Sequence, residues 1–156
     1  MSESKLHIIR DTRDQNPLIF SEYDYIEVGV DKLDAGDYTI RCHDMPGDDY
    51  SVMIERKADC QELVTNLCKN WDRFLAEAEL LSKYKVAQIV VCGPDNFEYL
   101  YTRGFTKLHP NFVYKQLTHL LCTYGISTTF LPDRASAESY IVRLFNNIRR
   151  ITNDNE

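Results

Sequence analysis

The chain has 156 residues, 44% of them hydrophobic, and a formal net charge of −6 at pH 7. This length and hydrophobic content are typical of one folded domain and exclude a disordered chain. No run approaches the ~18 apolar residues of a membrane-spanning helix, and the N-terminus lacks a signal peptide's apolar stretch. We therefore expect an intracellular protein with no membrane partner, in the cytoplasm or nucleoid of a prokaryote or virus-infected cell, or in the nucleus of a eukaryote.

The charge and the cysteine content narrow the possible classes of protein further. The negative net charge argues against a simple nucleic-acid-binding domain, because such domains are usually basic. The acids are concentrated in residues 22–37 and 44–62, however, and such a cluster repels phosphate only until it has bound a metal ion. The five cysteines are odd in number and form no Cys-x-x-Cys pair. We therefore expect reduced thiols, with Cys92 and Cys122 as small core residues.

Short strands are predicted in the first third of the chain. Apolar or alternating runs indicate them over residues 6–10, 25–30, 38–41 and 50–56. Turn-forming residues separate these runs, and residues 43–49, rich in Asp, Pro and Gly, form a predicted hairpin loop. Short strands separated by turns favour an antiparallel meander.

Helical spacing of the apolar residues begins at residue 62. It predicts a helix over 62–81, in two segments that meet near Asn70. A second helix over 111–124 ends at Gly125, which is a favourable C-cap. Asp133 is positioned to cap a last helix that runs to about Ile151.

Strands are predicted between these helices, over residues 86–92 and 126–131. The first is a nearly continuous apolar run, as in strands buried on both faces. The predicted fold class is therefore α/β, with a mixed central β-sheet flanked by helices. We expect one domain over residues 1–152 and a frayed tail at 153–156.

Three consecutive charges, Glu55-Arg56-Lys57, end the fourth predicted strand, and packing does not explain them. Because side chains alternate across a strand, Glu55 and Lys57 point to one face and Arg56 to the other. Asp37, which follows Gly36, brings a second carboxylate. A surface ion-pair patch is the common explanation of Glu-x-Lys alone. The upstream Gly-Asp pair and the downstream helix favour a metal site.

Such a site suits phosphodiester hydrolysis, which needs hydroxide at neutral pH and stabilisation of the charge that builds on the phosphoryl oxygens. Asp37 and Glu55 are the natural ligands of Mg²⁺ or Mn²⁺, with the backbone carbonyl of Arg56 as a third oxygen. Lys57 would orient the attacking water and offset the negative charge.

These motifs have a known counterpart. Gly36-Asp37 and Glu55-Arg56-Lys57, followed by Glu62-Leu63, resemble the Gly-Asp…Glu-Arg-Lys-x-x-x-Asp signature of the XPF-type nuclease family of excision-repair and flap endonucleases. One extra residue in the turn brings Glu62 to the place of the family's last Asp. The segment from Asp11 to Leu18 resembles the family's early Asp-x-Arg-Glu segment, above all in its stand-alone phage and bacterial members. Asp14 stands there in place of Glu.

The similarity extends over roughly residues 6–150. The helix with Trp71-Asp72-Arg73-Phe74 and Glu77, the strand after Tyr124 and the helix around Asp133-Arg134 are similar to the family's later segments. The resemblance implies the restriction-endonuclease-like fold. It also implies a Mg²⁺- or Mn²⁺-dependent DNA endonuclease that cuts branched, flap or junction DNA in repair, recombination or replication.

The resemblance assigns a role to each site residue. The implied catalytic residues are Asp37, Glu55, Arg56, Lys57 and Glu62. The implied metal ligands are Asp37, Glu55, Arg56, Asp14 and Glu62. Arg13 and Arg56 bind substrate phosphate or, equally, brace the acids by ion pairing. Asp11 supports the site.

Partners also follow from the resemblance. Family members usually pair with a second copy or an inactive relative through their C-terminal helices, and a tandem helix-hairpin-helix module usually follows. We expect no such module here, and hence a homodimer or a DNA-targeting partner protein. The helix 111–124 and the face of residues 137–148 are the candidate contacts.

The residues themselves leave two other functions open. A non-catalytic DNA-binding or scaffold subunit would keep the fold, although inactive relatives normally lose the charged set that is retained here. An acidic small-ligand-binding domain has only the net charge in its favour.

Five aromatic residues could either stack on nucleic-acid bases or lie in a core or an interface. They are Phe97, Tyr99, Tyr101, Phe105 and Phe112.

Overall fold

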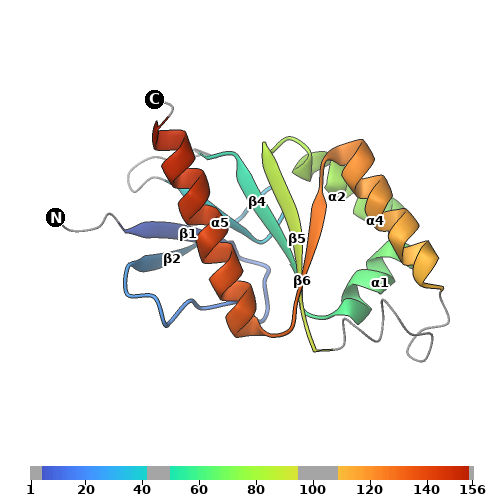
Figure 1. The fold of residues 1–156 in the computed structure, drawn as a ribbon, viewed down its shortest axis with the longest axis horizontal. Helices are drawn as coiled ribbons and strands as arrows, with labels where there is room; N and C mark the ends of the chain where they lie inside the picture. Colours follow the sequence, from blue (N-terminus) through green and yellow to red (C-terminus); the bar gives the residue numbers. More distant parts are fainter. Residues whose placement is uncertain (1–4, 42–49, 95–108, 155–156) are drawn as a thin grey trace.

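The computed structural model describes residues 5–41, 50–94 and 109–154, which form six strands and four helices (Figure 1). The strands are β1 (Leu6–Asp11), β2 (Ile26–Asp31), β3 (Tyr38–Arg41), β4 (Val52–Lys57), β5 (Val86–Cys92) and β6 (Ser127–Leu131). The helices are α1 (Cys60–Cys68), α2 (Trp71–Leu81), α4 (Pro110–Tyr124) and α5 (Arg134–Asp154). The predicted hairpin loop at 43–49 and the aromatic residues Phe97, Tyr99, Tyr101 and Phe105 lie outside the described residues.

All six strands form one mixed sheet in the order β2-β1-β3-β4-β5-β6. The predicted mixed α/β class is confirmed, but the predicted antiparallel meander is wrong for the first two strands, because β1 and β2 pair in parallel. Residues 12–25 carry the chain back along the sheet before β2 begins. This connection packs Leu18 and Phe20 into the core, which fixes its path.

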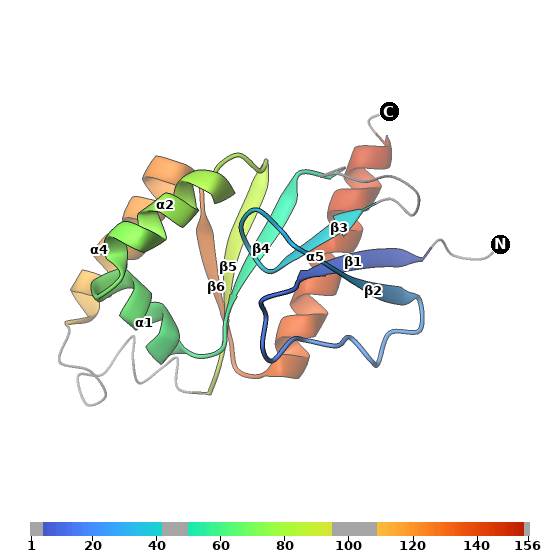
Figure 2. The same ribbon diagram turned by 180° about the vertical axis from the view of Figure 1, so that it is seen from behind.

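Helices cover both faces of the sheet. Helix α5 lies on one face, and α1, α2 and α4 lie together on the other (Figures 1 and 2). Two hydrophobic cores fill the spaces between these layers. Successive residues of β4 enter different cores, Met53 beneath α1 and α2 and Ile54 beneath α5. This alternation decides where the charged residues that follow them point.

The helix boundaries mostly agree with the sequence. The predicted break near Asn70 separates α1 from α2, and Gly125 ends α4 in the left-handed conformation at φ 71°. Helix α1 begins at Cys60, before the predicted start, because Asp59 caps it. Helix α5 continues past Ile151 to Asp154, so these tail residues are helical.

Two expectations about buried residues need correction. Cys92 is buried as predicted, but Cys122 lies on the exposed side of α4. The face of α5 that was expected to contact a partner belongs instead to the core, because Ala137 and Ile141 are fully buried. In the described ranges, no helix has the length and apolar character needed to cross a membrane.

Candidate active site

Gly36 allows Asp37 to reach the end of β4. Its φ of +81° lies in the left-handed region, and a Cβ atom there would come within 2.3 Å of Met53 Cγ. After this turn the Asp37 N–H donates to the carbonyl of Ile54 at 2.7 Å. The Asp37 Oδ2 atom then accepts a hydrogen bond from the Arg56 N–H, also at 2.7 Å. The Gly-Asp motif therefore fixes a carboxylate directly beside Glu55-Arg56-Lys57.

All three charged residues at the end of β4 are buried, with relative exposures of 7% for Glu55, 8% for Arg56 and 5% for Lys57. The Lys57 Nζ atom lies 3.1 Å from Glu55 Oε1 and 5.1 Å from the centre of the Phe74 ring on α2. Arg56 points to the opposite face, as the strand alternation predicts. The Phe74 ring and the Glu55 carboxylate together hold the ammonium group in place.

The buried carboxyl groups have raised pKa values. Burial, opposed by the Arg56 N–H and reinforced by the charge of Asp14, raises the pKa of Asp37 to about 6. Burial, and then the charge of Asp37, raises the pKa of Glu55 well above its usual range. Burial alone would lower the pKa of Lys57, but Glu55 outweighs it, so that pKa is raised. The contact with Glu55 therefore favours the ammonium form of Lys57.

Asp14 and Arg56 form a second buried pair on the other face. The Arg56 Nη2 atom donates to Asp14 Oδ1 at 3.0 Å and to the Asn16 carbonyl at 2.6 Å, while the Tyr38 hydroxyl donates to Asp14 Oδ2 at 2.7 Å. Burial favours a higher pKa for Asp14, but the hydrogen bonds from Tyr38 and Arg56 outweigh it and lower that pKa. Both side chains are thus engaged with each other.

Asp11 and Arg13 brace the loop before Gly36. Arg13 Nε and Nη2 contact the two Asp11 carboxylate oxygens at 2.7 and 3.2 Å, and Arg13 Nη2 also donates to the Leu33 carbonyl at 2.8 Å. The Leu33 N–H donates to Asp11 Oδ1 at 2.8 Å. This geometry suits the supporting role expected of Asp11. The Arg13 side chain remains 60% exposed.

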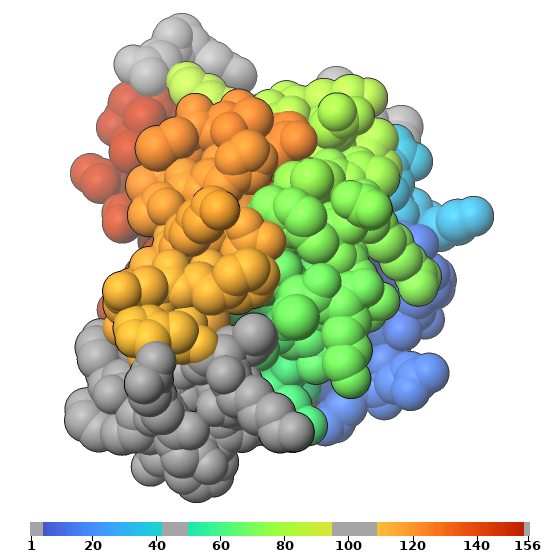
Figure 3. Space-filling view, turned by 90° about the vertical axis from the view of Figure 1, so that its right-hand side faces the viewer, coloured from blue at the N-terminus to red at the C-terminus, as the bar shows by residue number. Residues whose placement is uncertain are grey.

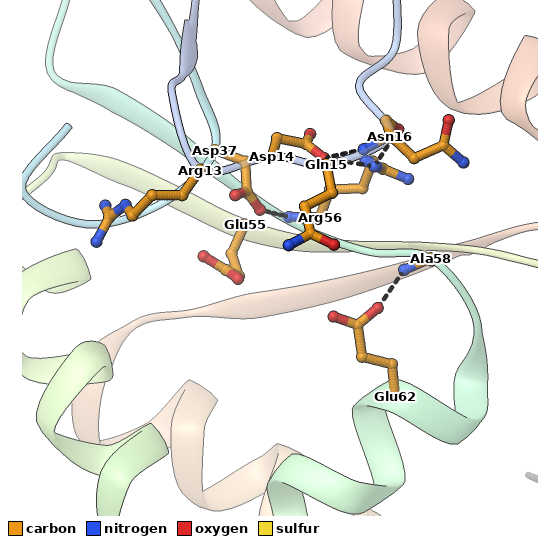
Figure 4. Close-up of a pocket in the computed structure, with 9 residues that line it drawn as sticks. All are labelled: Arg13, Asp14, Gln15, Asn16, Asp37, Glu55, Arg56, Ala58 and Glu62. Carbon is orange, nitrogen blue, oxygen red and sulfur yellow. Dashed lines mark hydrogen bonds and ion pairs between the residues drawn. The ribbon is translucent and has the colours of Figure 1, made fainter. Parts of the chain in front are cut away.

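Glu62 takes part in a reciprocal cap at the start of α1. Its Oε2 atom accepts from the Ala58 N–H at 2.7 Å, and its own N–H donates to Asp59 Oδ1 at 2.8 Å. Figure 4 shows its carboxylate turned toward Ala58. The extra residue in the turn thus makes Glu62 a capping residue as well as a member of the site's wall.

An open cavity of about 380 Å³ unites most of the predicted site residues (Figure 4). Its walls include Arg13, Asp14, Asp37, Glu55, Arg56 and Glu62. Lys57 lies against Glu55 without lining this cavity. Asp11 lines a second cavity of about 350 Å³, which shares Arg13 and Asp37 with the first. The two cavities meet at Asp37.

Two residues of the site had no role in the sequence prediction. The Tyr38 hydroxyl donates a hydrogen bond to Asp14, and the charge of Glu77 on α2 helps to raise the pKa of Glu55. Glu77 follows Phe74 by three residues, and this spacing places both on one side of a helix. That spacing and the position of Tyr38 next to Asp37 were the available signals.

The donor set suits a hard divalent cation, which prefers oxygen ligands. Asp37 and Glu55 offer carboxylates. The Arg56 carbonyl faces the same side as its N–H, toward Asp37, because both groups of one strand residue point to the same neighbour. Among the described residues, no three Asp, Glu, His or Cys side chains are already arranged as a complete metal site.

Comparisons with known proteins agree with this architecture. The family model for the ERCC4 domain matches residues 3–144. The solved structure of XPF from Aeropyrum pernix superposes with a TM-score of 0.70 at 22% identity, covering 95% of this chain and 67% of that one. A second structure, of XPF from Aeropyrum pernix in complex with DNA, gives 0.68 at 20% identity and covers 97% and 67%. A search of curated proteins found no significant match. The chain belongs to the ERCC4 domain family.

Proposed function

We propose that the chain is a Mg²⁺- or Mn²⁺-dependent endonuclease that hydrolyses phosphodiester bonds in branched, flap or junction DNA during repair, recombination or replication. The observation that carries this proposal is the pair of carboxylates formed by the half-buried Asp37 and the buried Glu55, beside the Lys57 ammonium at an open cavity. Family membership supports a nuclease, and one structural neighbour is a protein in complex with DNA.

Each residue has a distinct part in this proposal. Asp37 and Glu55, with the Arg56 carbonyl, bind the cation, which when bound promotes ionisation of a water molecule and stabilises charge on the phosphoryl oxygens. Lys57 keeps its proton, so it orients the water and offsets negative charge instead of taking a proton. Asp14 and Glu62 hold Arg56 and the start of α1 in place. Arg13, with its exposed side chain, contacts a substrate phosphate.

Cleavage assays test the proposal directly. End-labelled flap, fork, junction and linear duplex DNAs are incubated with the chain in Mg²⁺, in Mn²⁺ and in EDTA. We expect metal-dependent cutting of the branched substrates, and none by Asp37→Asn prepared in the same way. Equal cutting by parent and variant indicates a contaminating nuclease. An inactive parent that binds the branched DNAs indicates the scaffold function instead.

We further propose that a second copy or a DNA-targeting partner protein docks on the outer side of α4. Tyr114 is 37% exposed and Leu121 is 50% exposed, and their spacing of seven residues places them on the same side of the helix. Helix α4 lies at the surface beside α1 and α2 in Figure 3. Light scattering on the parent and on Leu121→Asp tests self-association. A monomeric parent would direct the search to a different protein.

A further inference from the structure

Gln15 lies on the wall of the cavity that contains the predicted metal ligands. It lines this space of about 380 Å³ together with Asp37, Glu55 and Glu62. Figure 4 shows the Gln15 amide directed into the cavity, toward the side where Glu55 and Glu62 lie. The amide is therefore placed where a substrate bound at Asp37 and Glu55 would meet it.

The main chain on both sides of Gln15 is fixed. Before it, the Asp14 carboxylate accepts a hydrogen bond from Arg56 Nη2 at 3.0 Å. After it, the Asn16 carbonyl accepts from Arg56 Nη2 at 2.6 Å and from Arg134 Nη1 at 3.1 Å. The Gln15 side chain thus extends from a well-held stretch of the connection between β1 and β2, which positions its amide for a ligand.

The Gln15 amide is a donor that the chain itself leaves unused. Its side chain is exposed and, within the described residues, has no hydrogen-bond or ionic partner. Two other donors on the same wall are engaged, since Arg56 donates to Asp14 and Arg13 donates to Asp11. An amide carries two N–H donors and no charge. Both donors of Gln15 remain available to a molecule in the cavity.

A phosphate oxygen is the acceptor that best suits this donor. A phosphate group has two non-bridging oxygens, and a cation held by Asp37 and Glu55 would contact one of them. The other oxygen then needs a donor from the wall of the cavity. A neutral amide can donate to it without repelling the metal ion, whereas a further positive charge at this place would repel it.

We propose that the Gln15 amide donates a hydrogen bond to a non-bridging oxygen of the DNA phosphate that is cut, and so holds this phosphate at the metal site. This inference rests on the proposed function. It assigns Gln15 to the substrate and not to the metal ion, so that loss of the amide should weaken DNA binding while the metal affinity is kept.

Affinity for fork DNA tests this contact apart from the chemical step. Binding is measured in Ca²⁺, which suppresses cleavage, for the parent, Gln15→Met and Asn147→Leu, a control that removes an exposed amide from α5. We expect Gln15→Met to bind about 10- to 100-fold more weakly, as when a hydrogen bond to a charged group is lost. Its Mn²⁺ affinity and its stability in urea should equal those of the parent. A DNA affinity within twofold of the parent, or an equal loss in Asn147→Leu, overturns the inference.

A modified substrate identifies the acceptor. The phosphate that the parent cuts is mapped and then replaced by a methylphosphonate, whose two separated diastereomers each lack a different non-bridging oxygen. For one diastereomer, the losses of affinity from the substrate and from Gln15→Met should not add, because both changes remove the same hydrogen bond. Additive losses with both diastereomers overturn the inference. A parent that cuts none of the DNAs contradicts the proposed function itself, which is a distinguishable outcome.

Discussion

The main-chain N–H of Arg56 donates to the Oδ2 atom of Asp37 at 2.7 Å, next to the bond from the Asp37 N–H to Ile54. The Asp37 side chain thereby extends the β3–β4 pairing by one step. Its position is set by the register of the sheet instead of by a flexible loop. This is the kind of fixed carboxylate that a metal site requires.

The raised pKa of Asp37 predicts that stability falls as the pH rises. Between the ordinary aspartate value and about 6, the folded chain keeps a proton that the unfolded chain has lost. Raising the pH through this window therefore destabilises the fold, by up to roughly 3 kcal/mol if the shift is about two pKa units. Asp37→Asn removes this penalty while it still offers an oxygen to the Arg56 N–H.

Urea unfolding at pH 4.5 and 7.5 without metal checks this prediction. We expect Asp37→Asn to be more stable than the parent at pH 7.5 and the difference to shrink at pH 4.5. Added Mn²⁺ should stabilise the parent at pH 7.5 and have little effect on the variant. Parallel pH curves for the two proteins would contradict the assignment.

Gly36→Ala should destabilise the fold more than Gly125→Ala. Both positions have positive φ, but a Cβ atom at Gly36 meets Met53 at 2.3 Å, whereas nothing lies within 4 Å at Gly125. The left-handed conformation costs about 1–2 kcal/mol in either variant, and overpacking adds about 1–3 kcal/mol at Gly36. Thermal or urea unfolding measures the difference, and equal losses would argue against the close approach.

Lys57→Met should abolish cleavage without weakening metal binding. The substitution keeps the apolar stem against Phe74 and removes the ammonium group that pairs with Glu55. Because the remaining charge is more negative, Mn²⁺ affinity should be unchanged or higher. Single-turnover cleavage should fall by about 100-fold or more, as when one group that stabilises a developing charge is lost. A variant that cuts within twofold of the parent would exclude the proposed role of Lys57.

Local patterns in the sequence predicted the strands, the helices and the Asp37–Glu55–Lys57 group, because each depends on near neighbours or on a motif. The parallel pairing of β1 with β2 was missed, since it depends on how Leu18 and Phe20 pack in the core. The interactions of the acidic residues Asp14 and Glu77 were missed for the same reason, because they depend on the tertiary packing. The spacing of Phe74 and Glu77 places them on one side of a helix, but it does not show that this side faces Glu55, just as the position of Tyr38 does not show its hydrogen bond to Asp14.

Arg73→Ala should weaken DNA binding more than Arg143→Ala. Arg73 lines the cavity beyond Asp37, whereas Arg143 lies on the exposed side of α5, on the other face of the sheet. Each phosphate contact that is lost should reduce the salt dependence of binding by about one unit of slope. Fork DNA affinity is measured at several salt concentrations in Ca²⁺, which replaces Mg²⁺ to suppress cleavage. Identical slopes for the two variants would place the DNA elsewhere.

Tyr38→Phe should loosen Arg56 while it leaves the metal ligands unchanged. The Tyr38 hydroxyl donates to Asp14 and accepts from the Leu18 N–H at 2.8 Å, and the ring is fully buried. Removing the hydroxyl leaves two buried polar groups without this partner, at a cost of about 1–3 kcal/mol.

The readouts of Tyr38→Phe separate the two faces of β4. Stability in urea should fall by that amount, and Mn²⁺ affinity should stay close to that of the parent, because Asp37 and Glu55 do not contact the hydroxyl. A large loss of Mn²⁺ affinity would instead make Asp14 a metal ligand, since its carboxylate is the one that Tyr38 holds. The variant therefore distinguishes an acid that braces Arg56 from an acid that binds the cation.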